Sequence, residues 1–533
     1  MMKRVLAIAL FLLFGSVAVQ AACSGSGSSL SCTVSSTLAQ INAAISSAPD
    51  GATLTLEPGT YVIPPLGGGA AFQFKPTKGL TIICATPPKA VGAATVNPCV
   101  MSGAGPTFGS DTFSGINTKF YRISGFTFDL QGSAPSLGTI YWDSYNGGSN
   151  SATLTRIRVD HNTFRNGATG AQTTLIGSGG QYMEVYGVYD HNLYTNATQF
   201  AMVIWIGDAN PNPPPSQLGT SNNLFFEDNV LSFTTVGNAS AEGCSDGWGG
   251  SAYVVRHNTA TNCLWAAHGV THSGGPANYE FYNNSTTMNA GSVSASTQDC
   301  YRCFHHQGSG TIIAFNNTFT AYSGKSNEVI SVLNYRDYPK AIDNGMPADA
   351  AQCNGTVNSP ADMPVVKDGN RAPTSANFGY PCWHQPGRDF RGNYKPMYAW
   401  NNYWSDTRAQ IPLVAPDAGG SPDYYSNHMQ NDREWFNAVS PSANSNPGFP
   451  FAGTTGMGFG TLANRPGTCT TSAEAGAGVG YFATDQGPQG TLYTCSATNT
   501  WTVYYTPYSY PHPLVGENTA GVPEPTDLTA VVQ

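Results

Sequence analysis

Titratable side chains are sparse in this chain, and a group of them lies between residues 242 and 306. Only 10% of the 533 residues are charged, and ten are histidines. Asp246, His272 and His305 each stand twelve residues before an asparagine of a repeated segment, so we expect them to stack on successive turns of the chain. An imidazole held beside a carboxylate suits proton transfer near neutral pH, where histidine titrates. We expect this group to be the catalytic centre.

Two further residues belong to the same group. His268 opens the segment HGVTHSGG, and Arg302 lies three residues before His305. An arginine can neutralise the carboxylate of a uronate sugar while a histidine removes the neighbouring proton, which is the chemistry of a polysaccharide lyase. A glycoside hydrolase instead needs two carboxyl groups that flank the bond, and the candidates are Asp246 with Glu242, or Asp190 with Glu227. In the remaining interpretation, these are polar residues of a structural turn.

The elements that would position these side chains are repeated strands. Seven segments align without gaps on one asparagine: IRVDHNTF, GVYDHNLY, LFFEDNVL, YVVRHNTA, YEFYNNST, IIAFNNTF and MYAWNNYW. The aligned residues are Asn162, Asn192, Asn229, Asn258, Asn284, Asn317 and Asn402. The residues three and five positions before each asparagine are mostly apolar, which marks the inward face of a strand. Seven copies indicate a solenoid, in which the stacked asparagines form a structural hydrogen-bonded ladder. We expect a similar structural role for His161, His191 and His257.

The positions two residues before each asparagine should point outward. They are Asp160, Asp190, Glu227, Arg256, Tyr282, Phe315 and Trp400. Neighbouring strands lie about 4.8 Å apart, so these residues would form one stripe of charges continued by aromatic rings, which stack well on sugars. We expect Glu227, Arg256, Tyr282 and Trp400 to bind substrate. Alternatively, an inserted loop covers the aromatic side chains and Arg256 neutralises Glu227.

The N-terminal residues predict export. Residues 1–22 have the basic start, apolar centre and small-residue exit of a signal peptide, so we expect a secreted protein, extracellular or periplasmic. The twelve cysteines form six near-neighbour pairs, which in an exported chain indicate disulfides. The pairs are Cys23/Cys32, Cys84/Cys99, Cys244/Cys263, Cys300/Cys303, Cys353/Cys382 and Cys469/Cys495. The short Cys300/Cys303 spacing is also compatible with a redox or metal motif.

The abundance of Gly, Ser, Thr and Asn favours an all-β protein. Near the N-terminus, Thr37 can cap a short helix with Leu38, Ile41 and Ile45 on one face, and a strand and a turn follow it. This start and the repeats resemble the right-handed parallel β-helices of the pectin-lyase-like superfamily, over about residues 35–410. The resemblance implies a β-helix with an N-terminal helical cap, and many members cleave or bind acidic polysaccharides.

A looser resemblance links the segments SDG, HG and YR to polygalacturonases of that superfamily. It implies an acid role for Asp246, a supporting role for His268 and substrate binding by Arg302. The chain departs from the pattern, because it has no Asn-Thr-Asp segment one turn earlier, no Asp-Asp pair at Asp246 and no Arg-Ile-Lys segment afterwards.

We therefore expect a β-helix over residues 23–440 with an insertion at about 335–396, a small β module over 441–515 and a loose tail over 516–533. The predicted partner is a polysaccharide, cleaved by a lyase that acts on a uronate polymer. A polygalacturonase-like hydrolase and a non-catalytic carbohydrate-binding or adhesive protein are the alternatives. The net charge of −9 argues against nucleic acid, and no further apolar run could span a membrane. The sequence requires no cofactor, although Asp160, Asp190 and Glu227 could hold a cation such as calcium, and it specifies no oligomeric state.

Overall fold

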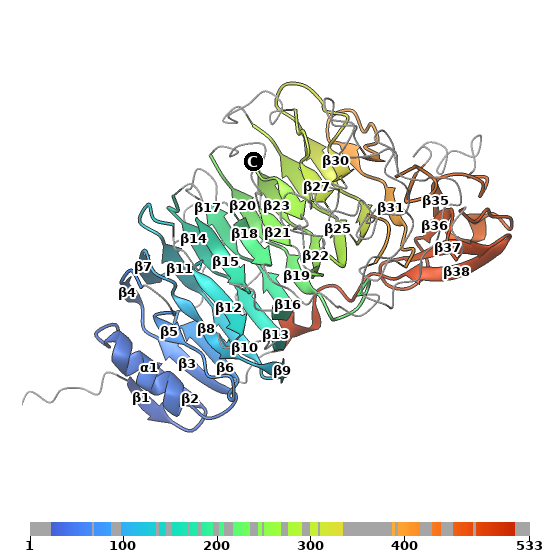
Figure 1. The fold of residues 1–533 in the computed structure, drawn as a ribbon. Coiled ribbons are helices and arrows are strands. Elements are labelled where there is room, and N and C mark those ends of the chain that lie inside the picture. The colour runs from blue at the N-terminus through green and yellow to red at the C-terminus, as the bar shows by residue number, and fades with distance from the viewer. Residues whose placement is uncertain are drawn as a thin grey trace, which may run out of the picture.

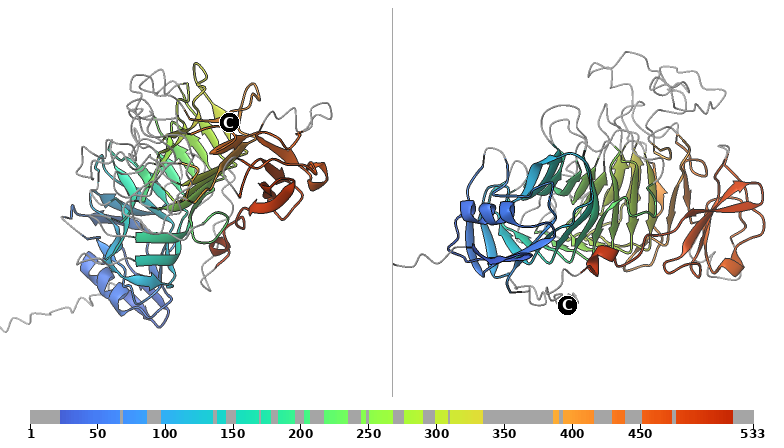
Figure 2. Two further views of the ribbon diagram at one scale, coloured as in Figure 1. Left: turned by 45° about the vertical axis from the view of Figure 1, so that its right-hand side comes forward. Right: turned by 90° about the horizontal axis from the view of Figure 1, so that it is seen from below.

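The protein is mostly β-structure, with three long sheets that lie side by side (Figures 1 and 2). The computed structural model describes residues 23–66, 69–86, 97–134, 138–144, 152–168, 171–177, 183–195, 202–206, 217–234, 244–247, 250–267, 276–289, 299–307, 310–333, 386–389, 393–415, 429–438, 451–472 and 476–517. The expected signal peptide, almost all of the expected insertion and residues 518–533 lie outside these ranges.

The chain passes through the three sheets in turn and adds one strand to each of them in every passage. Sheet A contains β1 (Cys23–Ser26), β2 (Ser29–Cys32), β3 (Ala52–Leu56), β6 (Leu80–Cys84), β10 (Tyr121–Ser124), β13 (Ala152–Asp160), β16 (Met183–Asp190), β19 (Leu224–Glu227), β22 (Ala252–Arg256), β25 (Asn278–Tyr282), β28 (Thr311–Phe315), β31 (Met397–Trp400) and β34 (Trp435–Asn437), with β9 (Gly115–Asn117) beside β13. Sheet B contains β4 (Gly59–Ile63), β7 (Cys99–Gly103), β11 (Phe126–Asp129), β14 (Thr163–Arg165), β17 (Leu193–Thr195), β20 (Val230–Ser232), β23 (Thr259–Thr261), β26 (Ser285–Thr287), β29 (Thr318–Thr320) and β32 (Tyr403–Trp404).

Sheet C contains β5 (Phe72–Gln73), β8 (Phe108–Phe113), β12 (Ile140–Ser144), β15 (Gln172–Ile176), β18 (Met202–Ile206), β21 (Ser245–Gly247), β24 (Trp265–Ala267), β27 (Phe304–Gln307), β30 (Ile330–Leu333) and β33 (Leu413–Val414). Apart from β1 and β2, the paired strands in these sheets are parallel. Side chains three and five residues before the repeated asparagines are buried in one core between the sheets, as the alternation predicts; examples are Ile157, Val159 and Phe226. Their burial removes apolar surface from water and stabilises each strand.

The predicted asparagine ladder is confirmed. Each side-chain amide from Asn162 to Asn317 donates to the side-chain oxygen of the next asparagine, at 2.8 to 3.1 Å, and Asn402 ends the row. The residue before each asparagine has a φ between 52° and 58°. Asn, Asp and His tolerate this left-handed conformation better than most residues, and all seven positions hold one of them: His161, His191, Asp228, His257, Asn283, Asn316 and Asn401. The bend between sheets A and B therefore explains this part of the repeat.

The predicted helix is α1 (Leu38–Ser47), which lies beside β1 and β5 at the N-terminal end. The Thr37 hydroxyl accepts the Gln40 amide, and the Gln40 side chain accepts the Thr37 amide, so the two residues form a capping box. Ile41 and Ile45 are buried, which confirms the expected apolar face.

Because the cap satisfies amides that the first helical turn leaves without partners, Thr37→Ala should lower the free energy of unfolding by about 1 kcal/mol. Denaturant unfolding measures this change. Ser35→Ala is the control, because its hydroxyl bonds the Thr33 side chain outside the helix. An equal effect of both substitutions would contradict the capping role.

The disulfide prediction is confirmed for the five pairs whose residues are described. These bonds join Cys23 to Cys32, Cys84 to Cys99, Cys244 to Cys263, Cys300 to Cys303, and Cys469 to Cys495. Cys353 and Cys382 lie outside the described residues, and no described cysteine is free. Disulfides of this number fit an extracellular protein.

Beyond the long sheets, a four-stranded sheet forms the C-terminal module. Its strands are β35 (Met457–Gly460), β36 (Gly480–Ala483), β37 (Thr491–Ala497) and β38 (Thr500–Tyr505). The pairs β36–β37 and β37–β38 are antiparallel, as expected, whereas β35 pairs with β36 in parallel. Residues 506–517, which we name the strap, continue from β38 back to β13 and β16 and include the 3-10 helix η4 (Pro513–Val515) (Figure 2).

Candidate functional site

Sheet C carries the described members of the predicted catalytic group. In the register of this sheet, Ser245 pairs with Trp265, and Trp265 pairs with Phe304. Trp265 and Phe304 belong to the core. Since side chains alternate along a strand, the next position on each strand lies on the outer face, and it is occupied by Asp246, Ala266 and His305.

Asp246 and His305 therefore lie in one column of sheet C. Their strands are separated by one intervening strand, so the two residues are about 10 Å apart along the column. The prediction for the position between them is wrong, because this position is occupied by Ala266 and not by His272. Counting twelve residues back from the ladder fails here, since Ala266 stands eighteen residues before Asn284. His268 and His272 lie outside the described residues.

The position of Arg302 is fixed by Glu328. Its Nε lies 3.4 Å from a carboxylate oxygen of Glu328, and its backbone amide donates to the Glu328 carbonyl. The guanidinium also lies over the Tyr301 ring, 4.7 Å from its centre. About one fifth of the Arg302 side chain is exposed. A sugar carboxylate at this position would share the guanidinium with Glu328.

The predicted outward stripe exists on sheet A, but it is covered. The pairing of neighbouring strands aligns all seven of its members, and each is at most 2% exposed. At one end, Arg122 bonds Asp160 through two nitrogens at 2.7 and 2.8 Å, and Arg158 bonds Asp190 in the same way at 3.0 and 3.1 Å. The carboxylates therefore alternate with arginines, which the sequence pattern did not show.

The arginines determine how these carboxylates titrate. Burial favours the protonated acid, but Arg158 and Arg122 outweigh it and hold the pKa of Asp160 well below its usual range. Burial also favours protonated Asp190, but Arg158 and the hydrogen bond to His191 together lower the pKa of this carboxyl. Burial dominates at Glu227 and raises its pKa to about 7, although Arg256 lies 2.6 Å away.

The C-terminal module covers the aromatic half of the stripe. Tyr282 stacks on Phe315 at 4.5 Å, Phe315 stacks on Trp400 at 4.4 Å, and Phe482 of β36 lies 4.6 Å from Trp400. The strap covers Glu227 and Arg256. Glu227, Arg256, Tyr282 and Trp400, which were expected to bind substrate, thus offer no open face to a sugar in this structure.

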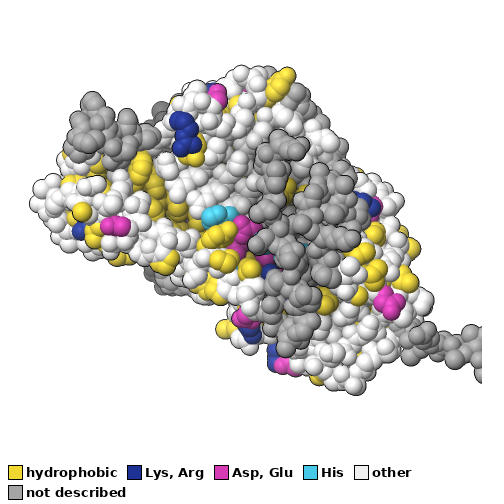
Figure 3. Space-filling view, turned by 180° about the vertical axis from the view of Figure 1, so that it is seen from behind, with side chains coloured by type: hydrophobic (Ala, Val, Ile, Leu, Met, Phe, Trp, Pro, Cys, Tyr) yellow, Lys and Arg dark blue, Asp and Glu magenta, His cyan; other side chains and the backbone are white. Residues whose placement is uncertain are grey.

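Part of the alternative interpretation describes this arrangement, because Arg256 pairs with Glu227. The covering element among the described residues is the C-terminal module and strap. The sequence pattern did not predict that the C-terminal segment packs on sheet A. The aromatic and proline-rich segment YYTPYSYPHPL is the part of the sequence that indicates a packed segment. In the space-filling view from behind, acidic and histidine side chains gather beside hydrophobic ones near the middle of the face (Figure 3).

The expected cation site at Asp160, Asp190 and Glu227 has its carboxylates bonded to arginines. In the part of the chain that the structure describes, no group of three or more His, Cys, Asp or Glu side chains could hold a metal ion.

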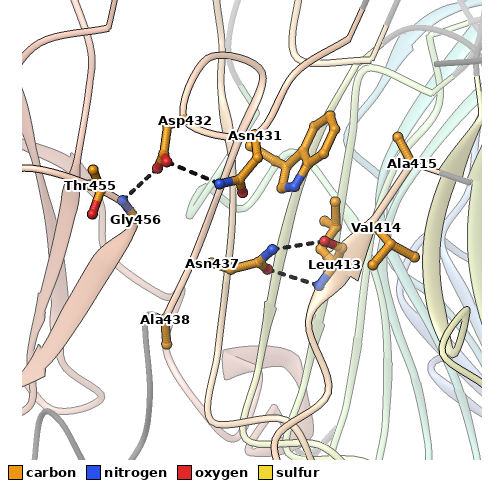
Figure 4. Close-up of a pocket in the computed structure, with 10 residues that line it drawn as sticks. Leu413, Val414, Ala415, Asn431, Asp432, Asn437, Ala438, Thr455 and Gly456 are labelled. Atoms are coloured by element: carbon orange, nitrogen blue, oxygen red, sulfur yellow. Dashed lines mark hydrogen bonds between the residues drawn. The ribbon is translucent and has the colours of Figure 1, made fainter. Parts of the chain in front are cut away.

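A cavity of about 540 Å³ lies where β33 and β34 end (Figure 4). Val414 and Trp435 line it together with polar residues. The Asn437 side chain bonds both backbone polar groups of Leu413 at 2.8 Å, so it ties sheet C to sheet A at this end. The described lining includes none of the residues predicted for the catalytic group.

No described helix has the length and apolar character needed to cross a membrane. No protein family matches the sequence, and no curated protein matches it. Among solved structures, the crystal structure of an alginate lyase from Paenibacillus sp. str. FPU-7 aligns with 56% of this chain and 99% of its own, at 16% identity and a TM-score of 0.29. A similarity this low does not assign an activity.

Proposed function

We propose that this protein is a secreted right-handed parallel β-helix that cleaves a uronate-containing polysaccharide as a lyase, on the outer face of sheet C. The observation that supports the site is the shared column of Asp246 and His305, with Arg302 three residues before His305. The five disulfides support an extracellular location.

In the proposed reaction, His305 removes the proton from the sugar carbon next to the carboxylate, and Arg302 neutralises that carboxylate. The electron pair of the broken C–H bond forms a carbon–carbon double bond, and the glycosidic oxygen leaves with the pair of the bond it loses. A proton donor must then protonate this oxygen. Asp246 lies about 10 Å from His305 along the sheet, which suits contact with a different part of the chain of sugars. His268 and His272 remain candidates for supporting roles.

A hydrolase would use Asp246 as the acid together with a second carboxyl group. Glu242, the predicted partner, lies outside the described residues. The two reactions differ in the mass of their products, because hydrolysis adds water and elimination does not.

Binding without catalysis is the second candidate function. One observation favours it: Asp246 and His305 are only 3% and 6% exposed. A proton-transfer pair needs access to its substrate, whereas buried polar residues suit a structural column.

Incubation of the purified protein with a panel of polyuronates and neutral glucans separates these functions. Mass spectrometry should find unsaturated oligosaccharides from a polyuronate. Products that have gained water would instead support the hydrolase, and retarded migration through a polyuronate gel without any product would support binding alone.

A further inference from the structure

The strap contacts sheet A through charged side chains as well as through apolar packing. Arg256 donates to the backbone carbonyls of Tyr508 and Ser509 at 2.7 and 2.8 Å, and Arg158 donates to that of Val515 at 2.9 Å. In the opposite direction, the His512 amide donates to Glu227 at 2.8 Å, and the Tyr510 hydroxyl donates to Asp228 at 2.8 Å. Arg156 also pairs with Glu517. These contacts are sensitive to any charge that is added between the two surfaces.

His512 of the strap is buried in this interface. Its ring lies 4.7 Å from that of Phe225 and 5.6 Å from that of Tyr508, and its side chain is near Arg256, Arg158 and Asp190. Its Nδ1 accepts the backbone amide of Leu514 at 3.2 Å. A proton on Nδ1 would remove this acceptor and place a third positive charge beside two arginines.

His257 of sheet A has a similar environment on the other side of the interface. The Tyr510 ring stacks on its imidazole at 3.7 Å with an interplanar angle of 13°, and the Tyr282 ring meets it edge-on at 6.4 Å. Its Nε2 lies 3.1 Å from the side-chain amide nitrogen of Asn283 and so serves as an acceptor. Arg256 is the neighbouring charge. In the docked arrangement both imidazoles therefore accept hydrogen bonds in their neutral form.

We infer that the strap is an acid-released latch: it covers sheet A at neutral pH, and protonation of His257 and His512 detaches it and uncovers Glu227 and Arg256. This inference concerns a conformational change and does not depend on the proposed enzyme activity.

The directions of the pKa shifts agree with this geometry. Burial and then Arg256 lower the pKa of His257 to about 4 and that of His512 to about 3, from a usual value of 6.5. A histidine whose docked pKa is lowered binds its proton more readily in the released state. Its contribution to docking is therefore complete above pH 6.5 and is lost as the pH falls toward the docked pKa.

The carboxyl groups act in the opposite direction. Burial raises the pKa of Glu227 from 4.5 to about 7, so its contribution to docking is complete below pH 4.5 and is lost as the pH rises through about 7. Burial also raises the pKa of Asp228. Between about pH 6.5 and 4.5, two histidines oppose Glu227 and Asp228, so release takes up at most about one net proton. Docking should then weaken by at most about tenfold per pH unit on acidification.

Hydrogen–deuterium exchange of the full chain, corrected for the intrinsic pH dependence of exchange, tests the latch. We expect protection of a peptide over residues 506–517 to fall, by at most about 100-fold, between pH 6.5 and 4.5, while protection of β28 stays constant. Constant protection of the strap over this range would overturn the inference.

Non-titrating variants identify the groups responsible. His512→Asn and His257→Gln keep an acceptor near the original ring nitrogen, and the double variant should show no acid release. His512→Asn alone leaves one histidine to oppose Glu227, so it should abolish most of the pH dependence of strap protection. This single variant tests the assignment if the double variant does not fold. An unchanged slope in the single variant would contradict the assignment.

His191→Gln is the matched control. Asp190 outweighs the effect of burial and raises the pKa of His191 to about 9, and this partner stays on sheet A when the strap leaves. The control should therefore retain acid release, and its loss there would point to a general destabilisation.

Discussion

His305→Gln should lower the turnover of a uronate polysaccharide by roughly 10²- to 10⁴-fold, because the amide cannot accept the proton that a general base removes. Glutamine is preferred to alanine here, since His305 is only 6% exposed and a smaller side chain would leave a cavity. Initial rates at equal concentrations of folded protein measure the effect.

The adjacent residue provides a control for this substitution. His306 lies on the same strand, but it pairs with Val332, a core residue, and therefore faces the interior. His306→Gln should leave the turnover per folded molecule unchanged, and denaturant unfolding measures its stability separately. Equal turnover of His305→Gln and the unmodified protein would remove His305 from the proposed reaction.

Arg122→Met should lower the free energy of unfolding by about 3–5 kcal/mol, which is the usual effect of removing one partner from a buried ion pair. Arg122 and Asp160 are both fully buried, and the substitution leaves the buried carboxylate with fewer donors and with one arginine, Arg158, instead of two. Denaturant unfolding at neutral pH measures the loss.

Lys119→Met is the comparison, because Lys119 pairs with Asp50 at the surface, where their side chains are 38% and 51% exposed. Water screens such a pair, so the change should be below about 1 kcal/mol. If Arg122→Met lowers the free energy of unfolding no more than Lys119→Met does, the buried ion pairs on sheet A contribute little to stability.

Most of the sheet A pattern was predictable because it is local. Asn229 and the inward residue Phe226 recur at fixed offsets within one strand, and strand alternation converts these offsets directly into inside and outside. The helix cap at Thr37 is local in the same sense. Pairing of near-neighbour cysteines was predictable because each cysteine has a close partner in the sequence, and disulfides are typical of the exported protein that we expected.

The parts that failed depend on loops or on contacts between distant residues. The offset of twelve residues holds for Asp246 and His305, but the position between them is occupied by Ala266, which stands eighteen residues before Asn284. The contact between Arg256 and Tyr508 spans 252 residues. No strand periodicity predicts such a contact, and for this reason an exposed sugar-binding stripe was expected where the structure has a covered one.

The formation of unsaturated uronate ends tests the central claim most directly. The purified protein should produce a continuous rise in ultraviolet absorbance with a soluble polyuronate and none with a neutral glucan, because only a uronate has the acidic proton next to a carboxylate. Absence of unsaturated product across polyuronates, from protein shown to be folded, would contradict the account.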